Sequence, residues 1–337
     1  MHARAYIELI MSSVASDSRT AAISPLPGWG SLPPEYAIPE QAPSPDEAQE
    51  YCRRLARTHY ENFSVASWFL PERLRQDFFN VYAYCRISDD LGDEVGDANA
   101  SLQLLDQWEA ELDACYAGSP RHPVFVALAD TVRKCEIPKQ TFVDLLTAFR
   151  QDQRISRYAT FEDVVGYCRY SANPVGHLVL YVCGYRDAER QELSDFTCTA
   201  LQLANFWQDV REDYARDRIY FPRDDMQRFG VDEATIASAT FTPAFRELMR
   251  YEVEYARKMF AQGMPLIGMV DRDLALDLDL FSRGGLEVLT AIEQQNYDVL
   301  RARPSISKPR KAALLLRALT GKFLGRNLAQ AAGRSAA

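Results

Sequence analysis

The sequence predicts an all-α fold, and three observations support this. Hydrophobic residues recur with the 3.6-residue period of a helix through long stretches of residues 46–302. Short clusters of Gly, Pro, Asn or Asp separate these stretches, as they do at helix ends. Few segments show the alternation and the Val, Ile and Thr enrichment of strands. We therefore expect a single large helical domain over residues 46–302, larger than a four-helix bundle.

The first 45 residues form the first element, and they differ from this domain. Seven of the 17 prolines lie between positions 25 and 45, together with glycines and serines. Such a composition buries little apolar surface, so we expect residues 1–45 to be a disordered, unpacked extension.

The helices that follow have recognisable boundaries. Ser44 is a suitable N-cap, Pro45 fits the first helical position, and Asp46 and Glu47 favour the first turn. Similar signals mark further helix starts or stops at Pro71, Pro120, Pro138, Thr160 and Thr242.

The next informative element is an acidic helix. Asp89 and Asp93 are four residues apart, so a helix projects both carboxylates from one face, and Asp90 starts the same spacing one step later. Tyr82 and Arg86 precede them on that face. An isolated pair of this kind is also typical of a solvated acidic surface.

A second helix repeats the arrangement in an apolar setting. Gln202, Asn205, Asp209 and Asp213 form one stripe, while Leu, Ala, Phe, Trp and Val cover most of the remaining circumference. A polar stripe on so apolar a helix should line an interior cavity. If the two acidic faces are opposed, at least four carboxylates meet in one cleft.

Such a cluster of carboxylates needs a counter-charge. Oxygen ligands without His or Cys suit Mg²⁺, which commonly bridges carboxylates to substrate phosphates. Arg86, Arg218 and Arg211 could bind phosphate oxygens. The chain has neither a P-loop nor a dinucleotide-binding fingerprint. These features favour Mg²⁺-assisted ionisation of an allylic or similarly activated diphosphate on a hydrocarbon substrate.

These two motifs resemble those of the squalene and phytoene synthase family. The matching stretches are residues 82–86 and 89–93, then 202–213 and 218–222. The resemblance implies a class I isoprenoid synthase fold with a central cavity and an isoprenoid diphosphate as substrate. It also implies that Mg²⁺ is held by Asp89, Asp93, Asn205, Asp209 and Asp213, with Asp90 in support.

Within this family, residues 59–68, 170–176 and 205–209 are most similar to the bacterial hydroxysqualene synthases of hopanoid biosynthesis. The implied reaction converts presqualene diphosphate and water into hydroxysqualene and pyrophosphate. The resemblance places substrate against Tyr82, Arg86, Gln202 and Arg218. Further substrate-binding or catalytic candidates in the matching stretches are His59, Phe63, Tyr170, Asn173, Arg211 and Tyr220. For the tyrosines a purely structural role is an equal alternative, and His59 could be a surface residue.

Two departures from the family pattern bear on the reaction. Squalene synthases that finish with hydride transfer usually have Arg immediately before the first Asp of the second motif, where this chain has Gln208. With no nicotinamide fingerprint either, we expect no NADPH and capture of the carbocation by water. Asn173 and Pro174 replace the family's usual turn, and Pro174 should interrupt the helix that starts near Phe161.

Two alternatives stay open. The same ionisation machinery would serve a presqualene diphosphate, squalene or dehydrosqualene synthase that couples two farnesyl diphosphates. A catalytically silent assembly factor is the other alternative, although all four motif aspartates are present.

The last element is a basic, amphipathic tail over residues 303–337. From Arg301 onward there are nine Arg or Lys residues and no Asp or Glu. Leu315, Leu319 and Phe323 share one side of a helical pattern beside this charge. The tail could bind anionic lipid reversibly, or it could dock on the acidic body of the chain.

Composition sets limits on partners and location. The chain has 337 residues, 47% of them hydrophobic, and a net charge of −9 that argues against nucleic-acid binding. Seven scattered cysteines are typical of a reducing compartment, and no apolar run is long enough to span a membrane. We expect a cytoplasmic protein that could bind the inner face of a membrane; its oligomeric state is not indicated.

Overall fold

The computed structural model confirms the all-α prediction. Among the residues that it describes there is no β-sheet, and a single bridge joins Arg157 and Ile219. None of the seven cysteines forms a disulfide bond. No helix in the described part is long and apolar enough to cross a bilayer. The described residues are 32–58, 71–307, 309–311, 313–314 and 316–317.

The helical region comprises two compact units. The first unit comprises the chain up to Arg154 together with residues 170–187, and the second comprises residues 155–169 and the chain from Ala188. The chain passes back and forth between the units. No Pro-rich or Gly-rich linker therefore marks a single boundary between them in the sequence. The predicted central cavity stays a prediction.

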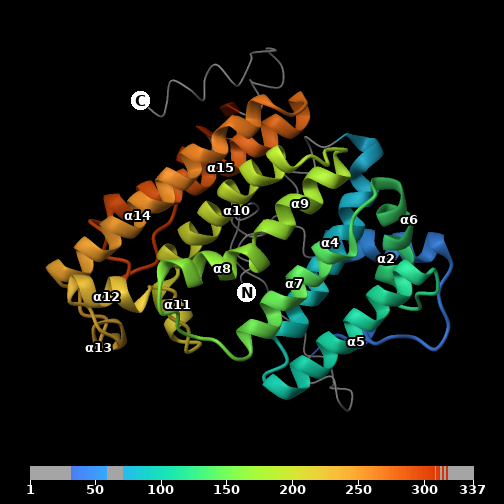
Figure 1. Ribbon diagram of the computed structural model, residues 1–337, viewed down its shortest axis with the longest axis horizontal. Coiled ribbons are helices and arrows are strands. Elements are labelled where there is room, and N and C mark those ends of the chain that lie inside the picture. Colours follow the sequence, from blue (N-terminus) through green and yellow to red (C-terminus); the bar gives the residue numbers. More distant parts are fainter. Residues whose placement is uncertain (1–31, 59–70, 308, 312, 315, 318–337) are drawn as a thin grey trace. The chain divides into compact units, whose positions relative to one another are not determined.

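The first unit is built around one almost completely buried helix, α4 (Figure 1). This helix contacts α2, α5, α6, α7 and α9, so the polar residues of its acidic end lie inside the unit. At Gly92 a side chain would lie 2.9 Å from the Phe149 ring, which explains the glycine within the motif. The elements of this unit are η1 Pro34–Tyr36, α2 Pro45–Thr58, η2 Glu72–Leu74, α4 Arg75–Asp93, α5 Ala98–Ala117, α6 Pro123–Cys135, α7 Lys139–Asp152 and α9 Asn173–Val182.

The second unit is centred on α10, which packs against α14 and α15 (Figure 1). The last half of α10 is buried throughout, and α11 follows it after Asp209. The elements of this unit are α8 Phe161–Ser171, α10 Ala188–Gln208, α11 Val210–Tyr214, α12 Arg223–Phe229, α13 Glu233–Ala237, α14 Pro243–Gly263, η3 Met264–Gly268 and α15 Arg272–Gln294; the last two residues of α8 belong to the first unit.

Local capping explains where several helices begin. Ser44 and Glu47 form a reciprocal cap at the start of α2, with the Ser44 amide 2.9 Å from a Glu47 carboxylate oxygen. Thr242 accepts a hydrogen bond from the Phe245 amide at the start of α14. The predicted helix interruption is confirmed, because α8 ends at Ser171 and α9 begins at Asn173.

The prediction of an unpacked extension is wrong for its last part. Leu32 and Tyr36 are buried, the latter only 1% exposed. The Tyr51 hydroxyl also donates to the main-chain carbonyl of Glu35 at 2.9 Å, which fixes this segment on α2. The prediction from Pro-rich composition failed because two buried apolar side chains, Leu32 and Tyr36, are enough to anchor a stiff segment. Residues 1–31 lie outside the described residues.

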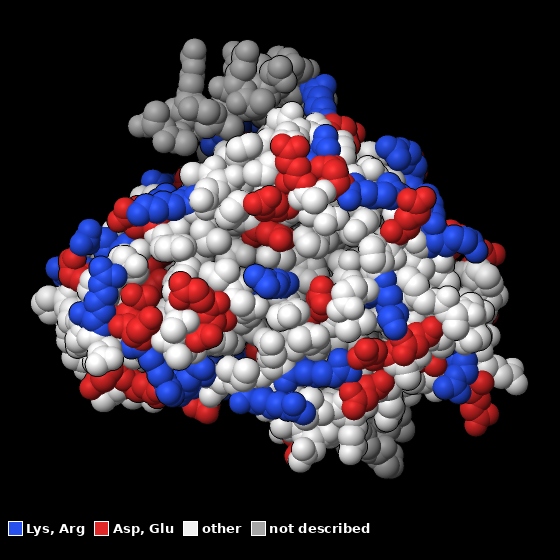
Figure 2. Space-filling view, in the orientation of Figure 1, with Lys and Arg blue, Asp and Glu red and all other residues white. Residues whose placement is uncertain are grey.

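Charged side chains of both signs are interspersed over the face shown in Figure 2. Exposed charged side chains form ion pairs, such as Lys139 with Asp113 and Arg150 with Asp106. Pairs this exposed contribute little to stability.

Candidate active site

The first acidic motif lies at the buried end of α4. Asp89 and Asp90 are 2% and 4% exposed, whereas Asp93, in the last turn, is partly exposed. Asp89 and Asp93 lie one helical turn apart, so the predicted shared face is confirmed. Tyr82 lies two turns earlier, and burial raises the pKa of its hydroxyl, which keeps it neutral.

Asp90 is held by two partners. The Arg86 guanidinium donates from Nε to Asp90 Oδ2 at 3.0 Å and from Nη2 to Oδ1. The Tyr36 hydroxyl donates to Oδ2 at 2.7 Å. Burial raises the pKa of Asp90, while the charge of Arg86 acts in the opposite direction. Because both oxygens of Asp90 accept hydrogen bonds, its first role in this structure is to fix Arg86.

The second motif is buried along its whole length. Gln202, Asn205, Asp209 and Asp213 are 0%, 2%, 8% and 2% exposed. Asp209 interrupts the helix between α10 and α11, yet the backbone bonds continue, since Asp209 N donates to Asn205 O and Asp213 N to Asp209 O, each at 2.8 Å. The stripe predicted from the 3.6-residue period is therefore preserved across the break.

Several polar atoms of this stripe have no hydrogen-bond partner among the described residues. They are both side-chain amide atoms of Gln202, Nδ2 of Asn205 and both carboxylate oxygens of Asp213. Burial, together with the nearby charge of Asp209, raises the pKa of Asp213 well above its usual value, and Arg218 acts in the opposite direction. A buried polar group without a partner costs about 1–3 kcal/mol. Five such atoms on one stripe indicate that the stripe binds a polar or charged ligand.

Asp209, in contrast, has a cationic partner from far along the chain. Arg303 donates from Nε to Asp209 Oδ1 and from Nη2 to Oδ2 at 3.1 Å, and it also reaches the Gln208 side-chain oxygen at 3.2 Å. Arg303 therefore supplies a guanidinium beside Gln208.

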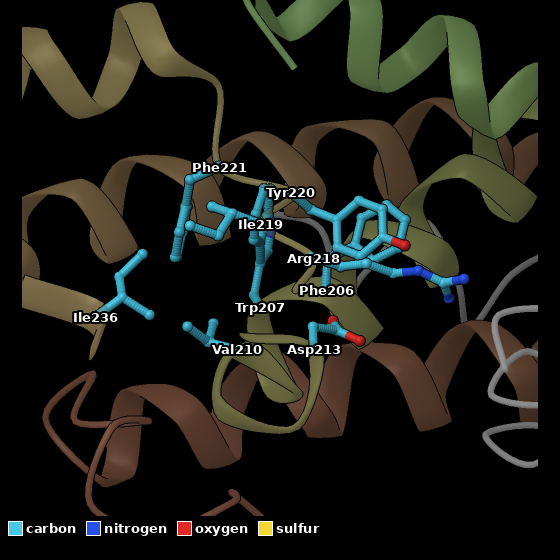
Figure 3. A pocket seen from close by; sticks show the side chains of 9 residues that line it. All are labelled: Phe206, Trp207, Val210, Asp213, Arg218, Ile219, Tyr220, Phe221 and Ile236. Carbon is cyan, nitrogen blue, oxygen red and sulfur yellow. The ribbon is translucent and has the colours of Figure 1, made fainter. Parts of the chain in front are cut away.

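A small pocket within the second unit is lined in part by residues of the second motif, among them Asp213 (Figure 3). Asp213 and Arg218 provide its polar lining, and the rings of Phe206 and Tyr220 stack at 3.7 Å between centroids. The cavity, about 10 Å³, holds roughly one water molecule and no isoprenoid chain. The remaining lining residues are Trp207, Val210, Ile219, Phe221 and Ile236.

The other predicted site residues that the structure describes lie on α8, α9 and α11. Arg211 is exposed and donates to the Leu300 carbonyl, so it binds the chain itself. Tyr170 is partly exposed near the end of α8, and Asn173 is buried as the first residue of α9. His59 and Phe63 lie outside the described residues.

The Mg²⁺ site stays a prediction. In the part of the chain that the structure describes, no three His, Cys, Asp or Glu side chains lie close enough together to hold a metal ion. The idea that the two motifs face one another is likewise still a prediction.

Two residues that bind these motifs, Tyr36 and Arg303, were not predicted from the sequence. Tyr36 falls in the segment that composition marked as unpacked, and Arg303 is the first residue of the basic tail, for which binding to lipid or docking on the acidic body was predicted. Neither has a signal near the motif it serves, because Tyr36 is 54 residues from Asp90 and Arg303 is 94 residues from Asp209.

Comparison with known proteins identifies relatives over most of the chain. The squalene/phytoene synthase family model matches residues 56–310. A 15-cis-phytoene synthase of Synechococcus elongatus is 31% identical over 281 residues, covering 80% of this chain and 91% of the relative. The crystal structure of squalene synthase HpnC from Alicyclobacillus acidocaldarius is 46% identical with a TM-score of 0.72, covering 75% of this chain and 95% of that one. A dehydrosqualene synthase in complex with a ligand is 27% identical with a TM-score of 0.73, and the match covers 82% and 96% of the two chains.

Proposed function

Because the chain belongs to the squalene/phytoene synthase family, whose members act on isoprenoid diphosphates, we propose that it is a hydroxysqualene synthase. Its reaction would convert presqualene diphosphate and water into hydroxysqualene and pyrophosphate, in a hopanoid pathway. Two things favour this member of the family. One is the 46% identity to a squalene synthase over almost the whole of that protein, and the other is the absence of a nicotinamide fingerprint in the sequence.

The observation that carries the proposal is the buried polar stripe of α10 and α11. Its unpartnered amide and carboxylate atoms belong to a mostly buried stretch, residues 200–213, in which Ala, Leu, Phe, Trp and Val side chains flank the stripe. These atoms do not stabilise a hydrophobic core, because each buried polar atom costs free energy unless a ligand forms a hydrogen bond with it. An anionic headgroup together with a cation is the ligand that these donors and acceptors suit best.

Mg²⁺ fits the donor set of both motifs. Carboxylate and amide oxygens are its preferred protein ligands, and residues 89–93 and 202–213 contain no competing His or Cys. The residues that would hold it are Asp89, Asp93, Asn205, Asp209 and Asp213. When bound, Mg²⁺ neutralises the charge that develops on the departing diphosphate.

The chain's own residues would do the rest. Arg86, fixed by Asp90, and Arg218 can donate to diphosphate oxygens as the carbon–oxygen bond breaks and its electron pair leaves with pyrophosphate. Phe206 and Tyr220, whose rings stack with 3.7 Å between their centroids beside Asp213 and Arg218, would offer aromatic faces to a nearby cation. Water then adds its oxygen to the carbocation, and the proton that it loses is taken up by the released pyrophosphate.

A second candidate is coupling of two isoprenoid diphosphates. The phytoene synthase relatives and the dehydrosqualene synthase structure favour it, because their names describe products of such coupling. The same acidic motifs would serve both reactions.

Product analysis separates these candidates. Purified full-length protein is incubated with Mg²⁺ and no NADPH, in parallel with presqualene diphosphate, farnesyl diphosphate or geranylgeranyl diphosphate. We expect an alcohol from presqualene diphosphate. Only hydrocarbons, or activity with geranylgeranyl diphosphate alone, would contradict the proposal and support the second candidate.

Matched variants keep this test specific for the site. Asp213→Asn should abolish product, since both Asp213 carboxylate oxygens lack a hydrogen-bond partner among the described residues. Asp225→Asn changes another buried aspartate of the same unit, outside the stripe, and should retain activity. Equal activity of the two variants would contradict the site assignment.

A further inference from the structure

Arg303 binds the second aspartate motif although it belongs to the segment that follows α15. It donates to both carboxylate oxygens of Asp209 and to the Gln208 side-chain oxygen. The Asp209 side chain is 11% exposed, whereas that of Arg303 is 46% exposed. The guanidinium therefore approaches the buried carboxylate from the solvent side.

The segment that carries Arg303 is fixed on both sides of this contact. The Gln208 side-chain amide donates to the Pro304 carbonyl at 2.6 Å, and Arg211 donates to the Leu300 carbonyl at 3.2 Å. The motif residues themselves thus hold the segment 300–304. The placement of Arg303 is a built feature of the fold rather than the random position of a surface side chain.

Asp209 and Asp213 bring two carboxylates close together, as a cation site requires. Asp209 and Asp213 are one helical turn apart, and the charge of Asp209 is one of the causes that raise the pKa of Asp213. Arg303 brings one positive charge to this pair. A divalent cation bound there would need the same Asp209 oxygens and would be repelled by a guanidinium a few ångströms away.

We propose that Arg303 is an internal counter-ion of the second aspartate motif, and that a divalent cation and the Arg303 guanidinium compete for the Asp209 carboxylate. Arg303 is thus a positioning residue that holds Asp209 in its buried orientation until the cation replaces it. This inference rests on the proposed function only in that the motif binds a divalent cation.

Binding of Mn²⁺ alone, measured by electron paramagnetic resonance on the full-length protein without substrate, tests the competition. Arg303→Met removes the charge but keeps the aliphatic stem. It should bind Mn²⁺ about five-fold more tightly than the unmodified protein, as expected for losing a competitor whose ion pair is half exposed to solvent. Arg303→Lys keeps the charge and should bind much as the unmodified protein does.

Arg310→Met is the matched control. Arg310 lies in the same C-terminal region but pairs with Glu287 at 2.8 Å, so this change should leave Mn²⁺ affinity unaltered. Unchanged or weaker binding by Arg303→Met, with normal binding by the unmodified protein, overturns the competition alone. No Mn²⁺ binding by any variant overturns both the competition and the metal part of the proposed function.

A second measurement requires no substitution. In the unmodified protein, the nuclear magnetic resonance signal of the Arg303 Nε–H should shift as Mg²⁺ is added, because its hydrogen bond to Asp209 breaks. A signal that stays in place while Mg²⁺ binds would contradict the proposal, even if the Arg303→Met protein failed to fold.

Discussion

Replacing Tyr36 with Phe removes one hydroxyl group and keeps the buried ring. That hydroxyl donates to Asp90 Oδ2 at 2.7 Å. A hydrogen bond to a charged group contributes about 1.5–3 kcal/mol, and the lower figure applies because Arg86 still donates to both oxygens of Asp90. We expect Tyr36→Phe to lower the free energy of unfolding by about 1.5 kcal/mol and to reduce Mg²⁺-dependent turnover, since Asp90 fixes Arg86.

Tyr51→Phe provides the comparison. The Tyr51 hydroxyl donates to the main-chain carbonyl of Glu35 at 2.9 Å, so it anchors the same segment without touching Asp90. Its loss should cost about 1 kcal/mol of stability and leave turnover unchanged.

Urea unfolding followed by tryptophan fluorescence gives the stability of each variant, and the initial rate of pyrophosphate release gives turnover. If the two variants lose turnover equally, Tyr36 does not act through Asp90, because it would then contribute only by anchoring the segment before α2.

The remaining predictions concern other parts of the chain. Glu252 is 0% exposed, both its oxygens lack a partner among the described residues, and burial raises its pKa well above 4.5. The folded protein therefore keeps a proton on Glu252 that the unfolded chain releases, so the free energy of unfolding falls as the pH rises above 4.5. Glu252→Gln should raise the melting temperature at pH 8 but not at pH 5. An effect of this substitution that is independent of pH would contradict the prediction. Gly263→Ala would place a methyl group 2.2 Å from Thr197 Oγ1 and should cost about 2 kcal/mol by thermal unfolding, whereas Gly166→Ala, with open space around it, should cost nothing; equal effects would refute the packing argument. Truncation after Lys311 should abolish co-sedimentation with vesicles containing phosphatidylglycerol, and equal retention of both forms would exclude membrane binding by the tail.

Local signals made much of the fold predictable from the sequence. Helix starts at Pro45 and Pro243 depend on caps within three or four residues, and both were confirmed. The division into two units was not predictable in this way, because it depends on contacts between residues far apart in the chain.

The candidate site shows the same limit. The stripe from Gln202 to Asp213 follows from helical periodicity, and burial of its members confirms that part of the prediction. Tyr36 and Arg303 could not be found, since each reaches its aspartate across more than fifty residues. Composition also concealed Tyr36, because it describes a segment on average and not the one side chain that packs.

In the proposed reaction the acidic motifs ionise a diphosphate, and water captures the resulting cation. The mass of the product formed from presqualene diphosphate and Mg²⁺ in H₂¹⁸O tests both steps. We expect an alcohol that carries one ¹⁸O atom, absent when Asp213 is replaced by Asn. An unlabelled alcohol, or a hydrocarbon as the sole product, would contradict this reaction.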